Sequence, residues 1–338
     1  MKNLIYLFAL SFAFFSCKKD SNNSSPSLFP TVYVAGFDGD TVKLWKDGIA
    51  SNLTNGSFSG QARSIFINGT DVYVAGSEFG PGTFPIAKYW KNGIAYPLTN
   101  GNAESNAFSI SVAGSDIYVA GYDGGPVNAY TKLWKNGVAN VLANPANVSN
   151  ATSIYVSGTD VYVAGTEVDA STYISTAKLW KNGIATDLTN GTNNASAFSV
   201  FVSGSDVYVS GTEIIAGVQL ARLWKNGVAT TLNSGTNTAY ATSVFVSGSD
   251  VYVTGIENDG THDIAMIWKN GAGTALNNGP YRGYANSVFV YGADVYVAGF
   301  EQTGSNSNTA VAKLWKNGVA TVLTSGTHVG EALAVLVQ

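Results

Sequence analysis

The sequence predicts an all-β fold in which seven blades, each of four antiparallel strands, close into a ring. A tryptophan recurs every 44 to 47 residues, and a tyrosine recurs with a similar period. Each copy holds four short β-type segments, and the first and last segments of the chain complete one copy between them. This repeat length and strand content indicate a seven-bladed β-propeller. The tryptophans are Trp45, Trp90, Trp134, Trp180, Trp224, Trp268 and Trp315, and the tyrosines are Tyr33, Tyr73, Tyr118, Tyr162, Tyr208, Tyr252 and Tyr296.

The four strands of a copy, A to D, follow from alternating apolar residues and turn signals. Residues 243–246 (SVFV) are typical of strand A, and residues 251–253 (VYV) follow a Ser-Gly-Ser-Asp turn as strand B. After a variable loop, residues 178–181 (KLWK) represent strand C in another copy. The pair Asn182-Gly183 predicts a type I′ hairpin, because both central positions of that turn need positive φ. Residues 184–188 (IATDL) then form strand D.

The two ends of the repeat region are complementary. The repeats begin at residues 31–33 (TVY), which correspond to strand B, and end at residues 332–337 (ALAVLV), which correspond to strand A. The last strand is therefore expected to complete the first blade and close the ring. A linear solenoid would instead need polar caps at its ends. The propeller domain is expected to cover residues 31–338.

The copies share the pattern A-x-S-V-x-V-x-x-x-x-V-Y-V-A-G, as in residues 241–255 (ATSVFVSGSDVYVTG). This pattern resembles the β-propeller repeats of bacterial secreted proteins, and the resemblance covers nearly all of residues 31–338. It implies architecture and leaves function open, because propellers host binding, scaffolding and catalysis.

The N-terminus has the organisation of an export signal. Lys2 precedes an apolar run over residues 4–15, which is too short to span a bilayer as a mature helix. The run ends at Ser16-Cys17, and Cys17 is the one cysteine of the chain, so no intramolecular disulfide can form. We expect residues 1–16 to be the signal peptide. An ordinary cleaved secretory signal is the alternative.

A single cysteine after a short apolar run resembles a bacterial lipobox, although Phe14 and Phe15 depart from its usual residues. The following Lys18, Lys19 and Asp20 resemble the surface-export signal of Bacteroidota lipoproteins. The resemblance implies acylation at Cys17 and attachment to the outer membrane, and the cell surface is the destination that it favours. Residues 17–30 contain many Ser, Asn and Pro and are expected to form a flexible tether.

Composition narrows the class of partner. The 338 residues carry a formal net charge of −4, and only 12% are charged. An acidic chain lacks the basic surface that nucleic acid binding needs. No P-loop, G-x-S-x-G or His/Cys metal motif is present, so the sequence indicates no cofactor. We expect a monomeric propeller.

Comparing the seven copies separates residues that serve the blade from residues free to serve a ligand. The tryptophans occur in every copy and are expected in the core. The lysine after each tryptophan is expected to be a solvated side chain that protects the blade edge from pairing with other chains. The lysines are Lys46, Lys91, Lys135, Lys181, Lys225, Lys269 and Lys316.

A carboxylate lies two residues after the Gly of every V-Y-V-A-G segment, and six copies carry a cation two residues before the Trp. We expect six cross-strand ion pairs of about 0.2–1 kcal/mol each. A ring of metal-binding or catalytic acids is the alternative. The pairs are Asp38 with Lys43, Glu78 with Lys88, Asp123 with Lys132, Glu167 with Lys178, Glu213 with Arg222, and Glu301 with Lys313.

The sixth copy lacks the cation, since Met266 replaces it and leaves Glu257 without that partner. Its loop contains Asp259, Gly260 and Asp263, and oxygen donors at alternate positions around a glycine weakly resemble a calcium loop. No glutamate follows at the twelfth position, so a plain polar loop is favoured over a calcium site formed by Glu257, Asp259 and Asp263.

The variable segments are the B–C and D–A loops, which lie at one end of a propeller and are where binding residues concentrate. The first residues of strand A also differ between copies, and they are expected near the mouth of the central channel. Aromatic and Arg side chains here suit a glycan or peptide ligand. The predicted ligand-binding residues are Tyr240, His262, Tyr281, Arg282, Tyr284 and Glu331.

Three functions compete. The first is a non-enzymatic binding or scaffolding lipoprotein at the cell surface, whose ligand is a glycan, a peptide or another envelope protein. The second is a polysaccharide-active enzyme, which a strongly raised pKa of Glu257 or Glu331 in a deep pocket would favour. The third is a structural role in docking outer-membrane proteins, which a broad apolar patch would favour.

Overall fold

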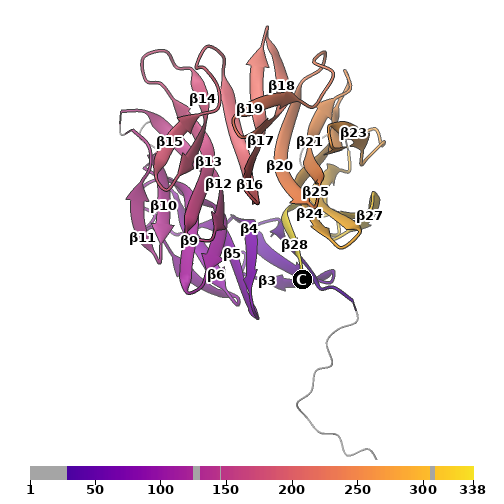
Figure 1. The fold of residues 1–338 in the computed structure, drawn as a ribbon. Helices are drawn as coiled ribbons and strands as arrows, with labels where there is room; N and C mark the ends of the chain where they lie inside the picture. The colour runs from indigo at the N-terminus through magenta and orange to yellow at the C-terminus, as the bar shows by residue number, and fades with distance from the viewer. Residues whose placement is uncertain (1–28, 125–129, 145, 305–308) are drawn as a thin grey trace, which may run out of the picture. The chain divides into compact units, whose positions relative to one another are not determined.

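The computed structural model describes residues 29–124, 130–144, 146–304 and 309–338. Its 28 strands form seven four-stranded antiparallel sheets, which confirms the predicted seven-bladed β-propeller (Figure 1). The predicted signal peptide, Cys17 and all but the end of the predicted tether lie outside the described residues. Within the described part, no helix has the length and apolar character needed to cross a membrane.

Each blade contributes one strand to each of four positions, from the channel outwards. The strands at position A are β28 (Gly330–Val337), β4 (Gly60–Asn68), β8 (Ser105–Ala113), β12 (Val148–Ser157), β16 (Ala195–Ser203), β20 (Ala239–Ser247) and β24 (Gly283–Tyr291). Those at position B are β1 (Val32–Asp38), β5 (Asp71–Phe79), β9 (Asp116–Asp123), β13 (Asp160–Val168), β17 (Asp206–Ile215), β21 (Asp250–Asn258) and β25 (Asp294–Gln302).

The two outer positions complete the blades, which we number one to seven in the order of these sets. The strands at position C are β2 (Thr41–Lys46), β6 (Pro85–Lys91), β10 (Tyr130–Lys135), β14 (Ser175–Lys181), β18 (Val218–Lys225), β22 (Asp263–Lys269) and β26 (Ala310–Lys316). The strands at position D are β3 (Ile49–Asn52), β7 (Ile94–Pro97), β11 (Val138–Val141), β15 (Ile184–Asp187), β19 (Val228–Thr231), β23 (Ala272–Ala275) and β27 (Val319–Val322).

The ring closes as the sequence predicts, because β28 pairs antiparallel with β1 in blade one. Figure 1 shows the yellow C-terminal strand returning to the indigo start of the propeller. Backbone hydrogen bonds extend the closure beyond the strands, since Thr31 and Gln338 each donate an amide to the other's carbonyl, at 2.8 and 3.0 Å. All strands and the closing sheet therefore lie within residues 31–338, so this fragment contains the whole ring.

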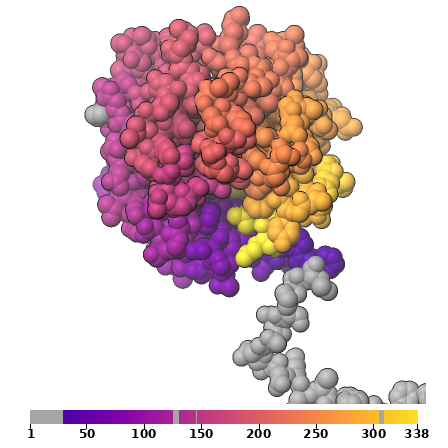
Figure 2. Space-filling model, viewed as in Figure 1, coloured from indigo at the N-terminus to yellow at the C-terminus, as the bar shows by residue number. Residues whose placement is uncertain are grey.

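The apolar core is divided among the seven junctions between blades. Each junction holds one cluster of buried residues, and each includes a tryptophan from one blade packed against the preceding blade in the ring. Trp90 of blade two, for example, packs with Tyr33 and Val42 of blade one. All seven tryptophans are at most 1% exposed, which confirms their predicted place in the core. The blades follow one another round the surface in chain order (Figure 2).

Every strand at position A contains a β-bulge that turns one side chain toward the channel. In β4 the pairing with β5 shifts between Ala62 and Ser64, so Arg63 has no partner in the register. Opposite the bulge stands Gly76, where a β-carbon would lie 1.9 Å from the backbone oxygen of Gln61. The V-Y-V-A-G glycine is therefore required by the close approach at the bulge.

Serine hydroxyls join the blades next to the channel. The Ser64 hydroxyl accepts a hydrogen bond from the Ile110 amide of the next blade at 3.2 Å, and equivalent serines make five further junctions. At the junction from blade one to blade two, Ala334 stands where the other copies have serine. The closing blade thus lacks the hydroxyl at one of its two junctions.

The A–B and C–D turns form one end of the propeller, which we call the turn face. Asn92 and Gly93 have φ of 51° and 82°, which confirms the predicted turn with two positive φ values. The Asn92 side chain accepts from the Val72 amide and donates to Asp71, so it joins the two turns. Five other blades repeat this contact.

The lysine after each tryptophan is part of this turn-face network. Six of the seven lysines are exposed, as the sequence predicts. Lys91 lies 2.7 Å from Asp71 and over the ring of Tyr73 at 5.2 Å. Equivalent ion pairs occur in six blades, and Lys46 of blade one lies over Tyr33. The hydrogen bonds from Lys91 and Asn92 lower the pKa of Asp71. The sequence interpretation missed the acids within reach of these lysines in six blades, and protection of the blade edge stays a prediction.

Candidate functional site

The B–C and D–A loops form the other end of the propeller, which we call the loop face. Backbone hydrogen bonds join the two kinds of loop, as where the Gln302 amide donates to the Arg282 carbonyl at 2.9 Å. In blade six the Nε2 atom of His262 lies 3.0 Å from the Gly279 carbonyl oxygen. The predicted separation into one variable and one uniform end is therefore correct for the described loops.

The central channel opens on the loop face as a cavity of about 470 Å³. Its walls come from strands at position A of all seven blades, joined by Ile256 of β21. Tyr240 and Tyr284, near the starts of their strands, form part of its rim, as the sequence predicts. The lining residues are Arg63, Phe108, Asn150, Thr152, Phe198, Tyr240, Thr242, Ile256, Tyr284, Asn286 and Leu333.

Arg63 supplies the one charged side chain in this lining. Its guanidinium lies over the Phe108 ring at 4.8 Å, and its Nε atom is buried without a hydrogen-bond partner among the described residues. Burial lowers the pKa of Arg63, while the charges of Glu331 and Tyr122 oppose that change. A guanidinium stays protonated in such a place, so the cavity holds a positive charge that no described carboxylate pairs within 4.0 Å.

Glu331 lies beside Arg63, at the second residue of β28. Burial raises the pKa of its carboxyl to about 7, and the attraction of Arg63 only partly offsets this. Burial also raises the pKa of Glu257. A carboxyl with a raised pKa is able to hold and release a proton near neutral pH. Glu331 is not among the residues lining the channel cavity.

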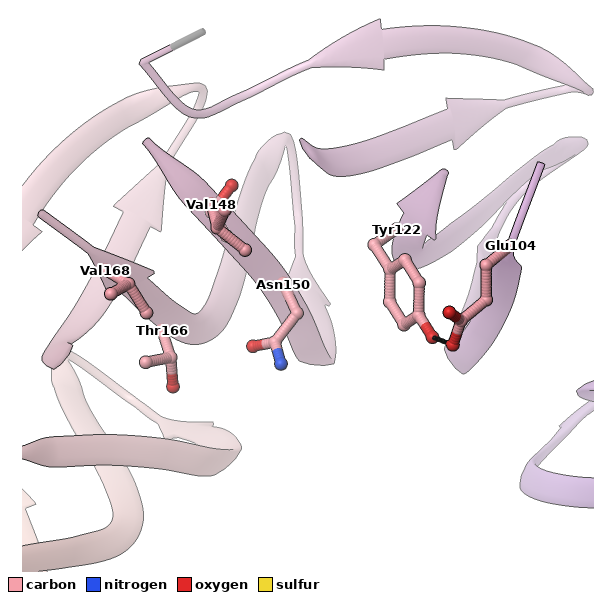
Figure 3. Close-up of a pocket in the computed structure, with 7 residues that line it drawn as sticks. Glu104, Tyr122, Val148, Asn150, Thr166 and Val168 are labelled. Atoms are coloured by element: carbon pink, nitrogen blue, oxygen red, sulfur yellow. Dashed lines mark hydrogen bonds between the residues drawn. The ribbon is translucent and has the colours of Figure 1, made fainter. Parts of the chain in front are cut away.

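A second cavity, of about 240 Å³, lies between blades three and four on the loop face. Figure 3 shows the Tyr122 hydroxyl bonded to the Glu104 carboxylate on one side, with Asn150 and Thr166 facing them across the pocket. Tyr122 donates to Glu104 at 2.6 Å and accepts from the Asn106 amide at 2.7 Å. Burial, and then the hydrogen bond to Glu104, raise the pKa of Tyr122 to about 12, while the hydrogen bond from Asn106 opposes this change. Asn150 lines both cavities, so the two adjoin.

The remaining predicted ligand-binding residues gather round Asp263 and not round the channel. The Tyr284 hydroxyl donates to Asp263 at 2.9 Å, and the exposed Arg282 lies 3.9 Å from the same carboxylate. The Tyr284 ring stacks on Phe300, with the ring centres 4.5 Å apart. Tyr284 therefore joins the channel mouth to this polar cluster, while Arg282 lies outside the cavity lining.

His262 and Tyr281 occupy the loops beside that cluster. The Nδ1 atom of His262 lies 2.7 Å from the Thr261 hydroxyl, and Tyr281 accepts from the Asn277 side chain through its backbone oxygen. Neither residue lines the channel cavity. The predicted set is thus divided: Tyr240 and Tyr284 at the mouth, Glu331 beside Arg63, and the other three on the surrounding loops.

In the loop of blade six, the acids that weakly suggested a calcium site are hydrogen-bonded to neighbouring groups. One oxygen of Asp259 accepts hydrogen bonds from the Thr261 hydroxyl and from the His262 and Thr261 amides, and these bonds lower the pKa of Asp259 to about 2. Asp263 is bonded to Asn258 and Tyr284. Among the described residues, no group of three or more His, Cys, Asp or Glu is arranged to hold a metal ion.

Four of the six predicted cross-strand ion pairs are present. They are Glu78 with Lys88 at 2.7 Å, Glu167 with Lys178 at 3.8 Å, Glu213 with Arg222 at 2.8 Å, and Glu301 with Lys313. Glu78 is opposite Ile86, and Lys88 is opposite Gly76, so each pair is diagonal across the ladder. The prediction was wrong for the two pairs that contain Asp, because its side chain is one methylene shorter. Lys43 instead donates to Asn52 at 3.0 Å.

The sequence interpretation missed the residues that define the channel. These are the variable x of the A-x-S segments, which the bulge turns inwards: Arg63, Phe108, Thr152, Phe198, Thr242, Asn286 and Leu333. The sequence does contain a signal for these residues, because x is the one variable position between two nearly uniform positions. In a regular strand the side chains alternate strictly between the two faces, and this alternation gives no reason to expect position x to face a cavity.

Comparison with known proteins adds support for the fold alone. No family model matches the chain, and no curated protein sequence matches it. Among solved structures, the chain is similar to a puromycin-hydrolyzing peptidase of Mycobacterium tuberculosis, with a TM-score of 0.52 and 10% sequence identity. The match covers 80% of this chain and 46% of that one, so the chain spans about half the length of the peptidase.

Proposed function

We propose that the protein is a non-enzymatic binding lipoprotein of the cell surface, whose loop face holds a glycan or peptide at the channel mouth. The observation that carries the proposal is the contrast between the two ends. The turn face repeats one polar network, whereas the loop face opens into a cavity of about 470 Å³ lined by residues that differ between blades. Variable residues on a rigid scaffold are the usual form of a binding site.

The point where the chain enters the propeller is consistent with a ligand site on the loop face. Thr31 pairs with Gln338, whose side chain donates to Gly69 in an A–B turn, so the propeller begins at the turn face. A lipid anchor at Cys17 would therefore be joined along the chain to the turn-face end of the propeller. Loss of metabolic lipid labelling in Cys17→Ala tests the anchor, and unchanged labelling would overturn it.

Binding is tested with glycan and peptide arrays and the fragment 31–338. Tyr240→Ala removes an aromatic side chain from the cavity rim, and we expect at least a tenfold loss of affinity. Tyr291→Ala is the matched control, because Tyr291 is an exposed tyrosine at the A–B turn of blade seven. No binding by wild type to any array, or equal binding by Tyr240→Ala, would contradict the proposal.

A glycan-cleaving enzyme is the second candidate, and the raised pKa of Glu331 favours it. A protonated carboxyl near neutral pH is the general acid that glycoside hydrolysis requires, and Glu104 is another carboxylate on this face. Release of reducing ends from polysaccharides, abolished by Glu331→Gln, would support this candidate over simple binding.

A further inference from the structure

The charge of Arg63 is the least explained feature of the channel. A buried cation is normally paired or hydrogen-bonded, because removing it from water is costly. Among the described residues, Arg63 forms no hydrogen bond and no ion pair, and its one close aromatic contact is with Phe108. Since only its Nε is sealed from solvent, the two terminal nitrogens are open to the cavity.

The groups around Arg63 limit the charge of a ligand group that it could bind. A guanidinium with two free terminal nitrogens matches the two oxygens of a carboxylate. Glu331 lies close enough to act on Arg63 electrostatically, and Glu104 lines an adjacent cavity together with Arg63. A phosphate dianion would bring a second negative charge beside these acids, so a singly charged carboxylate fits better.

The walls restrict what the carboxylate is attached to. Phe108, Phe198, Leu333 and Ile256 give the cavity extensive apolar surface, and besides Arg63 its polar groups belong to Asn, Thr and Tyr side chains. An apolar side chain next to a carboxylate fits these walls, whereas a sugar acid would place several hydroxyls against them. Because the cavity lies at the mouth of a channel, it also suits the end of a polymeric ligand better than an internal segment of that ligand.

We infer that the channel mouth binds the free C-terminal carboxylate of a peptide with an apolar last residue, and that Arg63 is the group that pairs with it. This inference rests on the proposed function and specifies its ligand. Phe108 contacts the guanidinium, and Asn150 lies in the same lining with a side-chain oxygen that has no hydrogen-bond partner among the described residues.

The test uses fragment 31–338 and synthetic peptides with randomised last four residues, each made with a free and an amidated C-terminus. Peptides retained by wild type are measured by fluorescence anisotropy. We expect the free acid to bind at least tenfold tighter than the amide, and Arg63→Gln to abolish that difference. Lys91→Gln is the matched control, because it removes one positive charge from the same blade at the turn face. Thermal unfolding checks that both variants fold.

The comparison of acid with amide in wild type needs no variant, so the inference stays testable if Arg63→Gln does not fold. Equal affinity of acid and amide, or an unchanged preference in Arg63→Gln, would overturn it. An oligogalacturonate that binds through Arg63 while no peptide binds would overturn the choice of a peptide. Binding that depends on Tyr240 but not on a carboxylate counts against the inference alone. No array binding at all counts against the proposed function.

Discussion

A β-carbon on Gly76 would lie 1.9 Å from the backbone oxygen of Gln61, so the bulge in blade two closes only over a glycine. The same approach, at 1.8 to 2.0 Å, recurs at the equivalent glycine of the other six blades. These glycines support the bulges, and the bulges turn the variable side chains into the channel. The repeat thus conserves its scaffold on strand B and varies its binding surface on strand A.

Replacing Gly76 with alanine is therefore expected to destabilise the propeller strongly. The backbone of β4 would have to move away from β5, and we expect a loss of about 2–4 kcal/mol in the free energy of unfolding. Urea unfolding followed by tryptophan fluorescence measures it. Gly82→Ala is the control, because a β-carbon there meets its nearest neighbour at 3.7 Å. A Gly76→Ala protein as stable as Gly82→Ala would show that the bulge adapts freely.

The serine hydrogen bonds between blades predict two substitutions with effects of opposite sign on the free energy of unfolding. Ser64→Ala leaves the Ile110 amide without its side-chain acceptor and should cost about 1 kcal/mol. Ala334→Ser places a hydroxyl at the junction that lacks one and should add stability of similar size. Thermal unfolding of both variants tests the pair. If Ala334→Ser lowers the unfolding temperature, the closing junction has no room or no donor for the hydroxyl.

The architecture was predictable because each level of the sequence favours the same blade. Tryptophan spacing, Asn-Gly turns and complementary ends agree, and none depends on fine geometry. The ion pairs show where such reasoning stops. A carboxylate and a cation at the right spacing pair when the acid is Glu78, but not when it is Asp38, because a diagonal across the ladder exceeds the reach of the shorter side chain.

The candidate site was only half predictable for a related reason. Tyr240 and Tyr284 were placed at the channel mouth because they begin strands at position A. Arg63 was missed because alternation along a regular strand does not reveal a bulge, and the raised pKa of Glu331 depends on burial between blades. Both features arise from packing between segments distant in sequence, such as β28 and β4.

Blade six provides a test of the ion-pair pattern. Met266→Lys should give Glu257 the partner that four other blades have, adding about 0.2–1 kcal/mol at pH 7. Burial raises the pKa of Glu257, and a nearby cation should lower it again. The gain should be present above the pKa of Glu257 and vanish on acidification. Lys313→Met in blade seven is the converse variant and should destabilise by a similar amount; equal stability of all three proteins would show that these pairs contribute nothing.

Glu331 should make the stability of the propeller depend on pH around neutrality. Its pKa rises from an ordinary value near 4.5 to about 7 on folding, so the folded state holds the proton more tightly than the unfolded state. The contribution of Glu331 to stability is therefore fully present below about pH 4.5 and is lost as pH rises toward 7, by at most about 3 kcal/mol. Glu331→Gln should remove this loss and unfold at a higher temperature than wild type at pH 8, whereas Asp40→Asn, which changes an exposed carboxylate, should not. Parallel pH profiles of the unfolding temperature for wild type and Glu331→Gln would mean that Glu331 ionises freely in the folded protein.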